Sequence, residues 1–461
     1  MTEGILTQPT ARVPFGQAMR NRYFLLDPAY VNLNHGSFGS TVRPVLDTLR
    51  AFQDASERAP DRYIRYEYPR LLDTSRHAAA AHLRVDPDEL VLVANATTAV
   101  NAVLRNLAPQ WGPGDVVLFL DTVYGATRKT IDWVVDTSPV EKMCVTFALP
   151  ASYVTILDAY REAFAECARQ GKSVRIVVLE TIPSLPGVRL PFEDMIRVAR
   201  AEGALTLVDG AHAIGHFPFD LRSLDPDFFT SNCHKWLYTP RGCAILYVPL
   251  RNQHLMRSSL PTSHWYQPLL QPGDQVAPPM PNPLPPSDKS NFVQQFEFVG
   301  TVDNAALLCV PAALQFRRDV CGGEDAIMRY CWDLAAQGGA AAARILGTEV
   351  MDNARGELRH QCSMVMVRLP LEMRKKEEEE EELTGCGQTG ALQIQSWMCE
   401  EMVSKHGTFI AILSYRGQWW ARFSAQIYLD TCDFEWGARV LVQLCAEAAV
   451  TFRDAILTSC A

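Results

Sequence analysis

The sequence lacks any apolar run long enough to cross a membrane. No stretch approaches the roughly 18 uninterrupted apolar residues of a transmembrane helix. The start, MTEGILTQPTARVPFG, contains an acid and prolines and has no apolar core of signal-peptide length, so we expect no secretory leader. Both absences favour a cytoplasmic protein that binds no membrane.

Paired cysteines and an excess of basic charge are also missing. The 13 cysteines are an odd number and include no CxxC pair, which predicts reduced thiols rather than a disulfide framework. Lys and Arg total 43 against 52 Asp and Glu, a net charge of −9. This balance argues against a general nucleic-acid binder, although a local basic site remains compatible with it. We expect no bound metal.

What the sequence does contain is an alternation of strand-like and helix-like segments. A length of 461 residues suggests two or three domains. Strand-like runs occupy 89–95, 114–121, 174–180, 204–210, 226–236 and 243–249, and helical patterns occupy 97–107, 128–136 and 192–203. The alternation predicts an α/β fold with a mostly parallel sheet, which binds ligands at the carboxyl ends of its strands.

The pattern also suggests where domains begin and end. We expect an N-terminal segment over 1–30, a large domain over 31–314 and a smaller α/β domain over 315–461, where a long helix, two strand-like runs and a final helix follow one another. Seven prolines in 271–286 predict an extended loop. The charge run and glycines of 374–390 predict a solvated or disordered surface loop, with an acidic binding tail as the alternative.

The strongest chemical signal is an acid and a lysine that follow two strand-like runs. Asp209 ends VDG, and Lys235 lies in SNCHKW. A lysine that condenses with an aldehyde needs a buried position and a lowered pKa. An aspartate at a strand end can hold a pyridine nitrogen protonated, which makes the ring an electron sink. Each residue alone would suit a helix cap or a surface charge, but the pair is typical of enzymes that use pyridoxal phosphate.

A phosphate site is expected near ANATTAV, residues 94–100. Backbone N–H groups at a helix start bind anions, and the hydroxyls of Thr97 and Thr98 add donors. The alternative is that Asn95 or Thr97 only caps the helix. Ser231 and His234 are further phosphate candidates because they adjoin the lysine.

Three other regions are candidates for substrate contact. Tyr124, in DTVYGAT, follows a strand end and is either a ring-stacking or acid residue or a plain core tyrosine. VNLNHGSFGS contains Asn34, His35 and Gly36 in a turn that either approaches a ligand closely or is an ordinary polar turn. Arg422, in WWARFSAQ, suits a carboxylate, with a structural ion pair as the alternative.

Together these motifs resemble the class V aminotransferase family of pyridoxal-phosphate enzymes, fold type I. LNHGSFG, DGAHAIG and HKWLYTPRG resemble its isopenicillin-N-epimerase-like branch. ELVLVANATTAVNAVLRN and WARFSAQIYLDTCDFEW are similar to the hercynylcysteine sulfoxide lyases of ergothioneine biosynthesis. The resemblance runs from about residue 14 to about residue 450. It implies a large domain with a mostly parallel sheet, a small α/β domain and pyridoxal 5′-phosphate as cofactor.

The resemblance also implies roles for individual residues. Lys235 resembles the cofactor-binding lysine, Asp209 the partner of the ring nitrogen, and His212 a family Gln or His beside the ring hydroxyl. Thr301, in GTVDN, resembles a phosphate contact supplied by the second subunit, which implies a homodimer. The phosphate ligands expected within one chain are Ala96, Thr97, Thr98, Ser231 and His234.

On the substrate side, the resemblance assigns the α-carboxylate to Arg422, with Asn34, His35 and Gly36 nearby. Tyr124 resembles the active-site tyrosine near the ring and the leaving group. Arg62 and Arg65 are either contacts for further substrate carboxylates or part of a solvated helix start.

The expected reaction is cleavage of a carbon–sulfur bond in a cysteine-conjugate sulfoxide by β-elimination. Two alternatives keep the cofactor: an amino-acid epimerase, and a cysteine desulfurase, for which Cys386 lies in an apparently flexible segment. A third alternative is a non-catalytic binding protein, against which the intact lysine, aspartate and arginine argue.

Overall fold

The computed structural model describes residues 13–266, 268, 282–373, 389–453 and 456–457. The described chain divides into two compact units. The large unit comprises Gly39–Pro183 and Leu190–Phe316, and the small unit comprises the described residues up to Phe38, Ser184–Arg189 and those from Arg317 onward.

This division places two segments differently from the expected domains. Residues 31–38 belong to the small unit because they bond to it: the Ser424 N–H donates to the Leu33 carbonyl at 2.8 Å. Residues 184–189 join it as well, since the Arg189 N–H donates to the Leu358 carbonyl at 2.8 Å. Such long-range pairings leave no signal in a single sequence.

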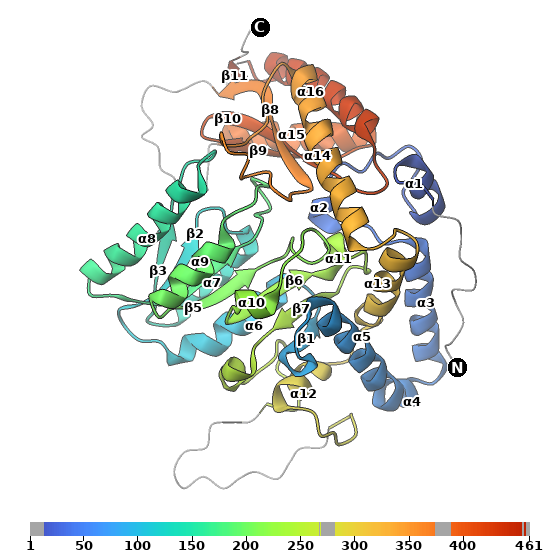
Figure 1. Ribbon diagram of the computed structural model, residues 1–461, viewed down its shortest axis with the longest axis vertical. Helices are drawn as coiled ribbons and strands as arrows, with labels where there is room; N and C mark the ends of the chain where they lie inside the picture. Colours follow the sequence, from blue (N-terminus) through green and yellow to red (C-terminus); the bar gives the residue numbers. More distant parts are fainter. Residues whose placement is uncertain (1–12, 267, 269–281, 374–388, 454–455, 458–461) are drawn as a thin grey trace. The chain divides into compact units, whose positions relative to one another are not determined.

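The large unit is built on a seven-stranded sheet with the order β1-β7-β6-β5-β4-β2-β3 (Figure 1). Strand β7 is antiparallel to its neighbours β1 and β6, and the other pairings are parallel. The predicted α/β fold with a mostly parallel sheet is therefore confirmed. The strands are β1 Leu90–Val93, β2 Asp115–Leu120, β3 Glu141–Val145, β4 Ser173–Glu180, β5 Leu205–Asp209, β6 Phe228–Asn232 and β7 Ala244–Tyr247.

Helices cover both faces of this sheet. Strands β2, β5 and β6 are buried almost along their whole length, as strands covered on both faces must be. Helices α6 (Ala96–Leu107) and α7 (Gly125–Thr137) share one core with alternate strand residues such as Val117, Phe119 and Ile176. Helices α8 (Tyr153–Arg169) and α9 (Phe192–Ala201) pack on strands β3 to β5. The other α-helices are α3 Arg43–Arg58, α4 Pro60–Arg62, α5 Tyr68–Leu83, α10 Leu221–Leu224, α11 Cys233–Trp236, α12 Asn291–Glu297 and α13 Val310–Asp319, whose last three residues are counted in the small unit.

Several features of the large unit differ from the sequence prediction, and two of them concern its strands. Strand β3 was not predicted, because its sequence EKMCV begins with two exposed charges at the edge of the sheet. The strand predicted over 226–236 ends at Asn232, and the short helix α11 follows it. This turn carries Lys235 out of the sheet. Of the proline-rich segment, 282–286 contains no helix or strand, and 271–281 lies outside the described residues.

The small unit has a four-stranded antiparallel sheet with the order β11-β8-β10-β9. Its strands are β8 Met364–Met373, β9 Ala411–Tyr415, β10 Gln418–Ser424 and β11 Ile456–Leu457, and its helices are α1 Gln17–Tyr23, α2 His35–Phe38, α14 Glu324–Leu346, α15 Thr389–His406 and α16 Thr431–Thr451. Helix α15 was not predicted. Residues 389–390 of the expected 374–390 loop begin it, and 374–388 lie outside the described residues.

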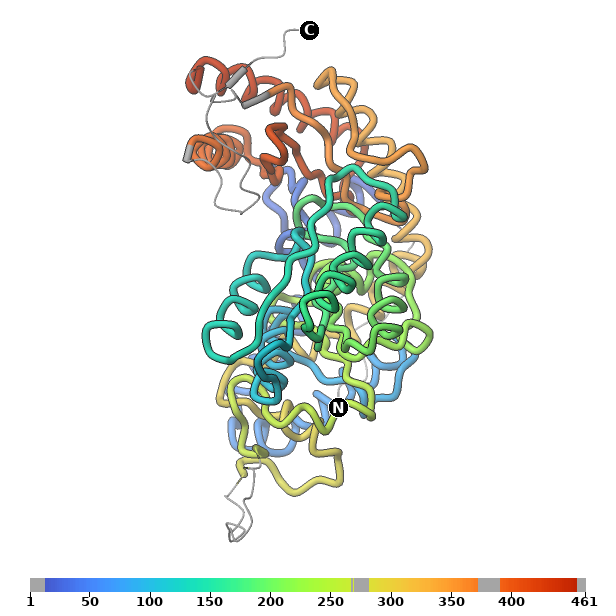
Figure 2. The backbone as a smooth tube through the Cα atoms, turned by 90° about the vertical axis from the view of Figure 1, so that its left-hand side faces the viewer, coloured from blue at the N-terminus to red at the C-terminus, as the bar shows by residue number. Residues whose placement is uncertain are grey.

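The N-terminal part of the small unit lies along its C-terminal part, as the blue and red tubes in Figure 2 show. Val31 forms a parallel bridge with Thr408, and the Gly16 N–H donates to the Ile427 carbonyl at 2.8 Å. These bonds place the LNHGSFG turn next to the end of β10, where Arg422 lies.

Candidate active site

The candidate cofactor residues of the large unit follow the carboxyl ends of its strands. Asp209 is the last residue of β5, and Lys235 lies in α11 directly after β6. Because β1 runs in the same direction as the parallel strands, the start of α6 lies at this edge too. The Ala96 N–H donates to the Asn232 side-chain oxygen at 2.9 Å, which ties the start of α6 to the end of β6.

Lys235 and His212 are in direct contact. The Lys235 Nζ lies 3.0 Å from the His212 Nε2, and both side chains are buried, with Lys235 8% exposed. The other ring nitrogen of His212 accepts a hydrogen bond of 3.2 Å from the Trp236 indole N–H. The sequence had placed these two residues in one site, and the structure brings them together.

Asp209 is held in a polar setting within the core. It is 5% exposed; its Oδ1 accepts from the Ala211 N–H at 3.1 Å and its Oδ2 from the Thr127 hydroxyl at 3.2 Å. Burial raises the pKa of this carboxyl, while the hydrogen bonds from the Ala211 N–H and the Thr127 hydroxyl oppose the shift. Thr127 was missed, since a helical threonine gives no signal of such a contact.

A second buried acid lies beside Asp209 and was also missed. Glu180 ends β4 in register with Asp209 and is 3% exposed. It accepts hydrogen bonds of 3.1 Å from the Thr122 hydroxyl and from the Tyr124 backbone N–H. Burial, followed by the nearby charge of Asp209, raises its pKa well above the ordinary value. A carboxylate ending an apolar strand, as in VVLE, was the available signal.

The start of α6 is a capped helix. The Asn95 side chain accepts from both the N–H and the hydroxyl of Thr98, at 2.8 and 3.1 Å. Asn95 therefore caps the helix, which was the alternative to phosphate binding, and Thr98 donates to this cap. Thr97 lies at the second helical position, half-buried, between Ala96 and Thr98.

Ser231 and His234 bond to the backbone. The Ser231 hydroxyl donates to the Gly210 carbonyl and accepts from the Ile214 N–H at 3.0 Å. The His234 Nδ1 lies 3.2 Å from the Cys243 carbonyl, so Nδ1 carries the hydrogen and Nε2 has the lone pair. Burial lowers the pKa of His234 to about 4, so the ring is neutral at pH 7.

Two predicted residues are exposed. Tyr124 precedes α7 and is 49% exposed, and its backbone is held by Glu180. Thr301 is exposed in the segment before α13, next to the exposed Val302.

The small unit carries the candidate substrate residues around a buried arginine. Arg422 is 0% exposed. Its Nη1 donates to the Ser184 carbonyl at 2.5 Å, and its Nη2 donates to the Asn34 Oδ1 and the Ser37 hydroxyl, both at 2.6 Å. These partners are all neutral, and Nε has none among the described residues. Burial lowers the pKa of Arg422 to about 10.

The LNHGSFG turn is fixed to the same strand. The Gly36 N–H donates to the Ser424 hydroxyl at 3.2 Å, and the His35 Nδ1 lies 3.0 Å from the Tyr428 hydroxyl. The structure thus brings Asn34 to Arg422 and Gly36 to the strand that carries it. A role for His35 in packing against Tyr428 is also evident.

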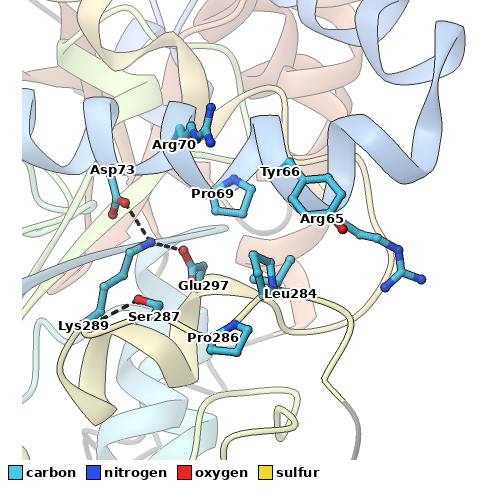
Figure 3. A pocket seen from close by; sticks show the side chains of 11 residues that line it. Arg65, Tyr66, Pro69, Arg70, Asp73, Leu284, Pro286, Ser287, Lys289 and Glu297 are labelled. Atoms are coloured by element: carbon cyan, nitrogen blue, oxygen red, sulfur yellow. Dashed lines mark hydrogen bonds and ion pairs between the residues drawn. The ribbon is translucent and has the colours of Figure 1, made fainter.

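One pocket of about 180 Å³ lies elsewhere in the large unit, and it includes Arg65 (Figure 3). The Arg65 guanidinium pairs with Asp61 at 3.0 Å and donates to the Pro283 carbonyl at 2.8 Å. Arg62 pairs with Glu67 at 2.8 Å. These pairings agree with the alternative that both arginines have local roles.

Several expectations concern the chain as a whole. Each cysteine in the part of the chain that the structure describes is a free thiol, and Cys386 lies outside that part. Bonding to Cys243 and burial raise the pKa of Cys233 well above its ordinary value, which makes it unreactive. Among the described residues, no cluster of His, Cys, Asp or Glu suits a metal, and no helix is long and apolar enough to span a membrane.

A buried lysine, a buried aspartate and a capped helix start at one edge of such a sheet define an enzyme of the pyridoxal-phosphate class, fold type I. Residues 41–269 match the model of the family described as "Aminotransferase class-V". The chain is 39% identical over 452 residues to the "L-cysteine desulfhydrase-like protein lolT1" of Epichloe uncinata, covering 96% of this chain and 98% of that protein. The chain belongs to the class V aminotransferase family.

Two further similarities are to a relative with a named activity and to a solved structure with the same fold. The hercynylcysteine sulfoxide lyase of Schizosaccharomyces pombe is 26% identical over 434 residues, covering 94% of this chain and 98% of that one. A solved complex of the cystine C–S lyase C-DES with cysteine persulfide superposes with a TM-score of 0.68 at 16% identity, covering 90% of this chain and 97% of that chain. The protein is therefore a pyridoxal-phosphate enzyme whose relatives include a carbon–sulfur lyase and desulfhydrase-like proteins.

The residues of the large unit fit this cofactor. Each Asp209 oxygen accepts one hydrogen bond, so the carboxylate keeps lone pairs for a ring N–H. Lys235 offers an amine at the same sheet edge, and α6 directs its N-terminal dipole there.

Proposed function

We propose that the protein cleaves the β carbon–sulfur bond of hercynylcysteine sulfoxide. The α C–H and β C–S bonds break, a sulfenic acid leaves, and water converts the remaining three-carbon fragment to pyruvate and ammonia. The observation that supports this chemistry most is the buried Lys235 beside His212, on the same sheet edge as Asp209. A sulfoxide is a better leaving group than a thioether, because the departing anion is more stabilised.

Lys235 is the proposed general base for the α-proton. Bound pyridoxal phosphate supplies an aldehyde that takes up the substrate amine and a ring that stabilises negative charge at the α-carbon. As a free amine, the Lys235 Nζ would take the proton from that carbon. Asp209, fixed by Ala211 and Thr127, would hold a proton on the ring nitrogen.

Tyr124 is the proposed acid or orienting group for the leaving sulfur. Its half-exposed side chain starts α7, and its N–H bond to Glu180 fixes the backbone at that point. A fixed backbone at this point limits the positions from which the hydroxyl could give its proton to the departing group.

Arg422 is the proposed partner of the substrate α-carboxylate, with Asn34, His35 and Gly36 beside it. Its buried positive charge has only neutral hydrogen-bond partners, and Nε is unused among the described residues. Burying a cation in this way is costly unless an anion completes the site. A carboxylate would supply that charge through paired N–H···O bonds.

The phosphate is proposed to bind at the start of α6, near Ala96, Thr97 and Thr98, with Ser231 and His234. His234 would have to gain a proton at Nε2 to donate to the phosphate, because its Nδ1 hydrogen bonds Cys243. Ser231 would have to turn its hydroxyl from Gly210. A homodimer is part of the proposal, with the exposed Thr301 serving the partner's site; light scattering of the holoenzyme tests it.

The Lys235→Ala variant tests the assignment. Reconstituted wild type should release pyruvate from hercynylcysteine sulfoxide, and the variant should release none above the buffer rate. Lys129→Ala, which removes an exposed lysine on α7, is the matched control and should keep wild-type activity. Pyruvate formation by Lys235→Ala at the control's rate would remove Lys235 from the mechanism.

L-Cysteine is a second candidate substrate, favoured by the printed name of the relative at 39% identity. The two substrates would give different sulfur products, since cysteine would yield sulfide and the sulfoxide a sulfenic acid. Measuring pyruvate from each compound at equal concentration decides between them. An epimerase would instead introduce solvent deuterium at the α-carbon without pyruvate, and a desulfurase would leave alanine.

A further inference from the structure

Trp236 is the residue next to the candidate catalytic lysine, and its role is not covered by the proposed reaction. Its indole Nε1 lies 3.2 Å from the Nδ1 of His212, whose Nε2 lies 3.0 Å from the Lys235 Nζ. All three side chains are buried. They form a row in which the histidine connects the tryptophan to the lysine.

The chemistry of the indole decides which nitrogen of His212 carries the hydrogen. An indole N–H is a donor only, so the nitrogen that faces it must offer a lone pair. His212 Nδ1 is therefore unprotonated, and a neutral ring must carry its hydrogen on Nε2. A doubly protonated ring, or a hydrogen on Nδ1, would set two donors against each other inside the core, which costs free energy.

The same argument determines the protonation state of Lys235. An Nε2–H directed at the Lys235 Nζ needs a lone pair on that nitrogen, and only the neutral amine has one. A protonated Lys235 would oppose this donor with a donor of its own. The neutral amine is also the form that condenses with an aldehyde.

Packing keeps the indole in place. The His216 ring centroid lies 4.1 Å from that of Trp236, and the His216 Nδ1 lies 2.8 Å from the His212 carbonyl. Gly215 has a φ of +79°, and a Cβ there would lie 2.6 Å from the Trp236 carbonyl oxygen. The DGAHAIGH turn thus wraps the tryptophan tightly enough to hold its N–H on His212.

We propose that Trp236 is a positioning residue that locks His212 as the Nε2–H tautomer and thereby keeps Lys235 a neutral amine ready for the cofactor. The inference rests on the proposed function of Lys235 as the cofactor lysine. It assigns the N–H donor of His212 to the side that faces Lys235. It also gives a physical reason for the adjacency of lysine and tryptophan in HKW.

The tautomer is measured directly in the apo protein with ¹⁵N-labelled histidine. The wild type at pH 7.5 should show His212 with a protonated Nε2 and an unprotonated Nδ1, the signal being assigned by its loss in His212→Gln. A doubly protonated ring or an Nδ1–H tautomer in the wild type would overturn the proposal. This measurement needs no variant of Trp236 to fold.

The second readout is the rate at which pyridoxal phosphate condenses with the apo protein, followed by absorbance. Trp236→Phe keeps the ring and removes the N–H, and loss of one such hydrogen bond should slow condensation about three- to tenfold. The control Trp111→Phe alters a buried tryptophan of the main core and should keep the wild-type rate. Equal condensation rates for the wild type, Trp236→Phe and Trp111→Phe would contradict the proposed role of Trp236. If Lys235→Ala still formed pyruvate, the proposed function would fail while the tautomer result stood.

Discussion

Replacing Arg422 by Met separates a functional buried charge from a structural one. Burial lowers the pKa of Arg422 from 12.5 to about 10, and at 1.36 kcal/mol per pKa unit the charge costs the fold about 3 kcal/mol. Met removes that cost and loses hydrogen bonds to Ser184, Asn34 and Ser37. At about 0.5–1.5 kcal/mol each, these bonds are worth about 1.5–4.5 kcal/mol. The two effects nearly cancel, so the free energy of unfolding should change by less than about 1.5 kcal/mol.

The effect on catalysis should be large. If Arg422 holds the substrate carboxylate, its loss removes a buried charge pair of about 2–5 kcal/mol, which lowers kcat/KM about 30- to 5,000-fold. Urea unfolding and pyruvate release measure the two quantities. Arg317→Met is the control: Arg317 is equally buried but pairs with Glu324, so its removal should cost about 1.5–3 kcal/mol of stability, the range for a hydrogen bond to a charged group. The reasoning is refuted if Arg422→Met loses that much stability while kcat/KM stays at the wild-type value.

Three further variants test residues that lie beside Asp209, Arg422 and Lys235. Glu180→Gln should remove a pH dependence: the raised pKa of Glu180 gives stability that is present below its ordinary pKa and lost as pH rises through the folded-state pKa. Thermal melts over a pH series should show a flatter profile for the variant, and an unchanged profile would contradict this. Gly187→Ala places a Cβ 2.9 Å from the Arg422 Cδ, so we expect about 1–3 kcal/mol of overpacking and at least tenfold lower kcat/KM. Gly112→Ala, with nothing within 4 Å, should match the wild type in both. The apo wild type should lose stability as pH falls from about 6.5 toward 4, because the lowered pKa of His234 disfavours the charged ring; His234→Gln should lose less over that range.

The sheet, and the position of the candidate cofactor residues at its edge, could be predicted because both leave local signals. Buried parallel strands give nearly continuous apolar runs, and the polar residue that ends each run marks the binding edge. Asp209 and Lys235 were found in this way. Strand β3 was not predicted because an edge strand needs little apolar surface. Helix α15 was not predicted because an acidic run precedes it in the sequence.

The supporting contacts could not be predicted because they join residues far apart in the chain. Thr127 bonds Asp209 across 82 positions, and Asn232 bonds Ala96 across 136. Glu180 became noticeable only when the register of β4 and β5 set it beside Asp209. The orientation of the His212 ring likewise depends on a tryptophan 24 positions away.

The central claim is carbon–sulfur cleavage by β-elimination, and one incubation tests it most directly. The holoenzyme is mixed with hercynylcysteine sulfoxide in deuterated buffer, and pyruvate, ammonia and the deuterium content of unreacted substrate are followed together. The account predicts one pyruvate and one ammonia for each substrate consumed. Substrate that gains deuterium at the α-carbon while no pyruvate forms would contradict it.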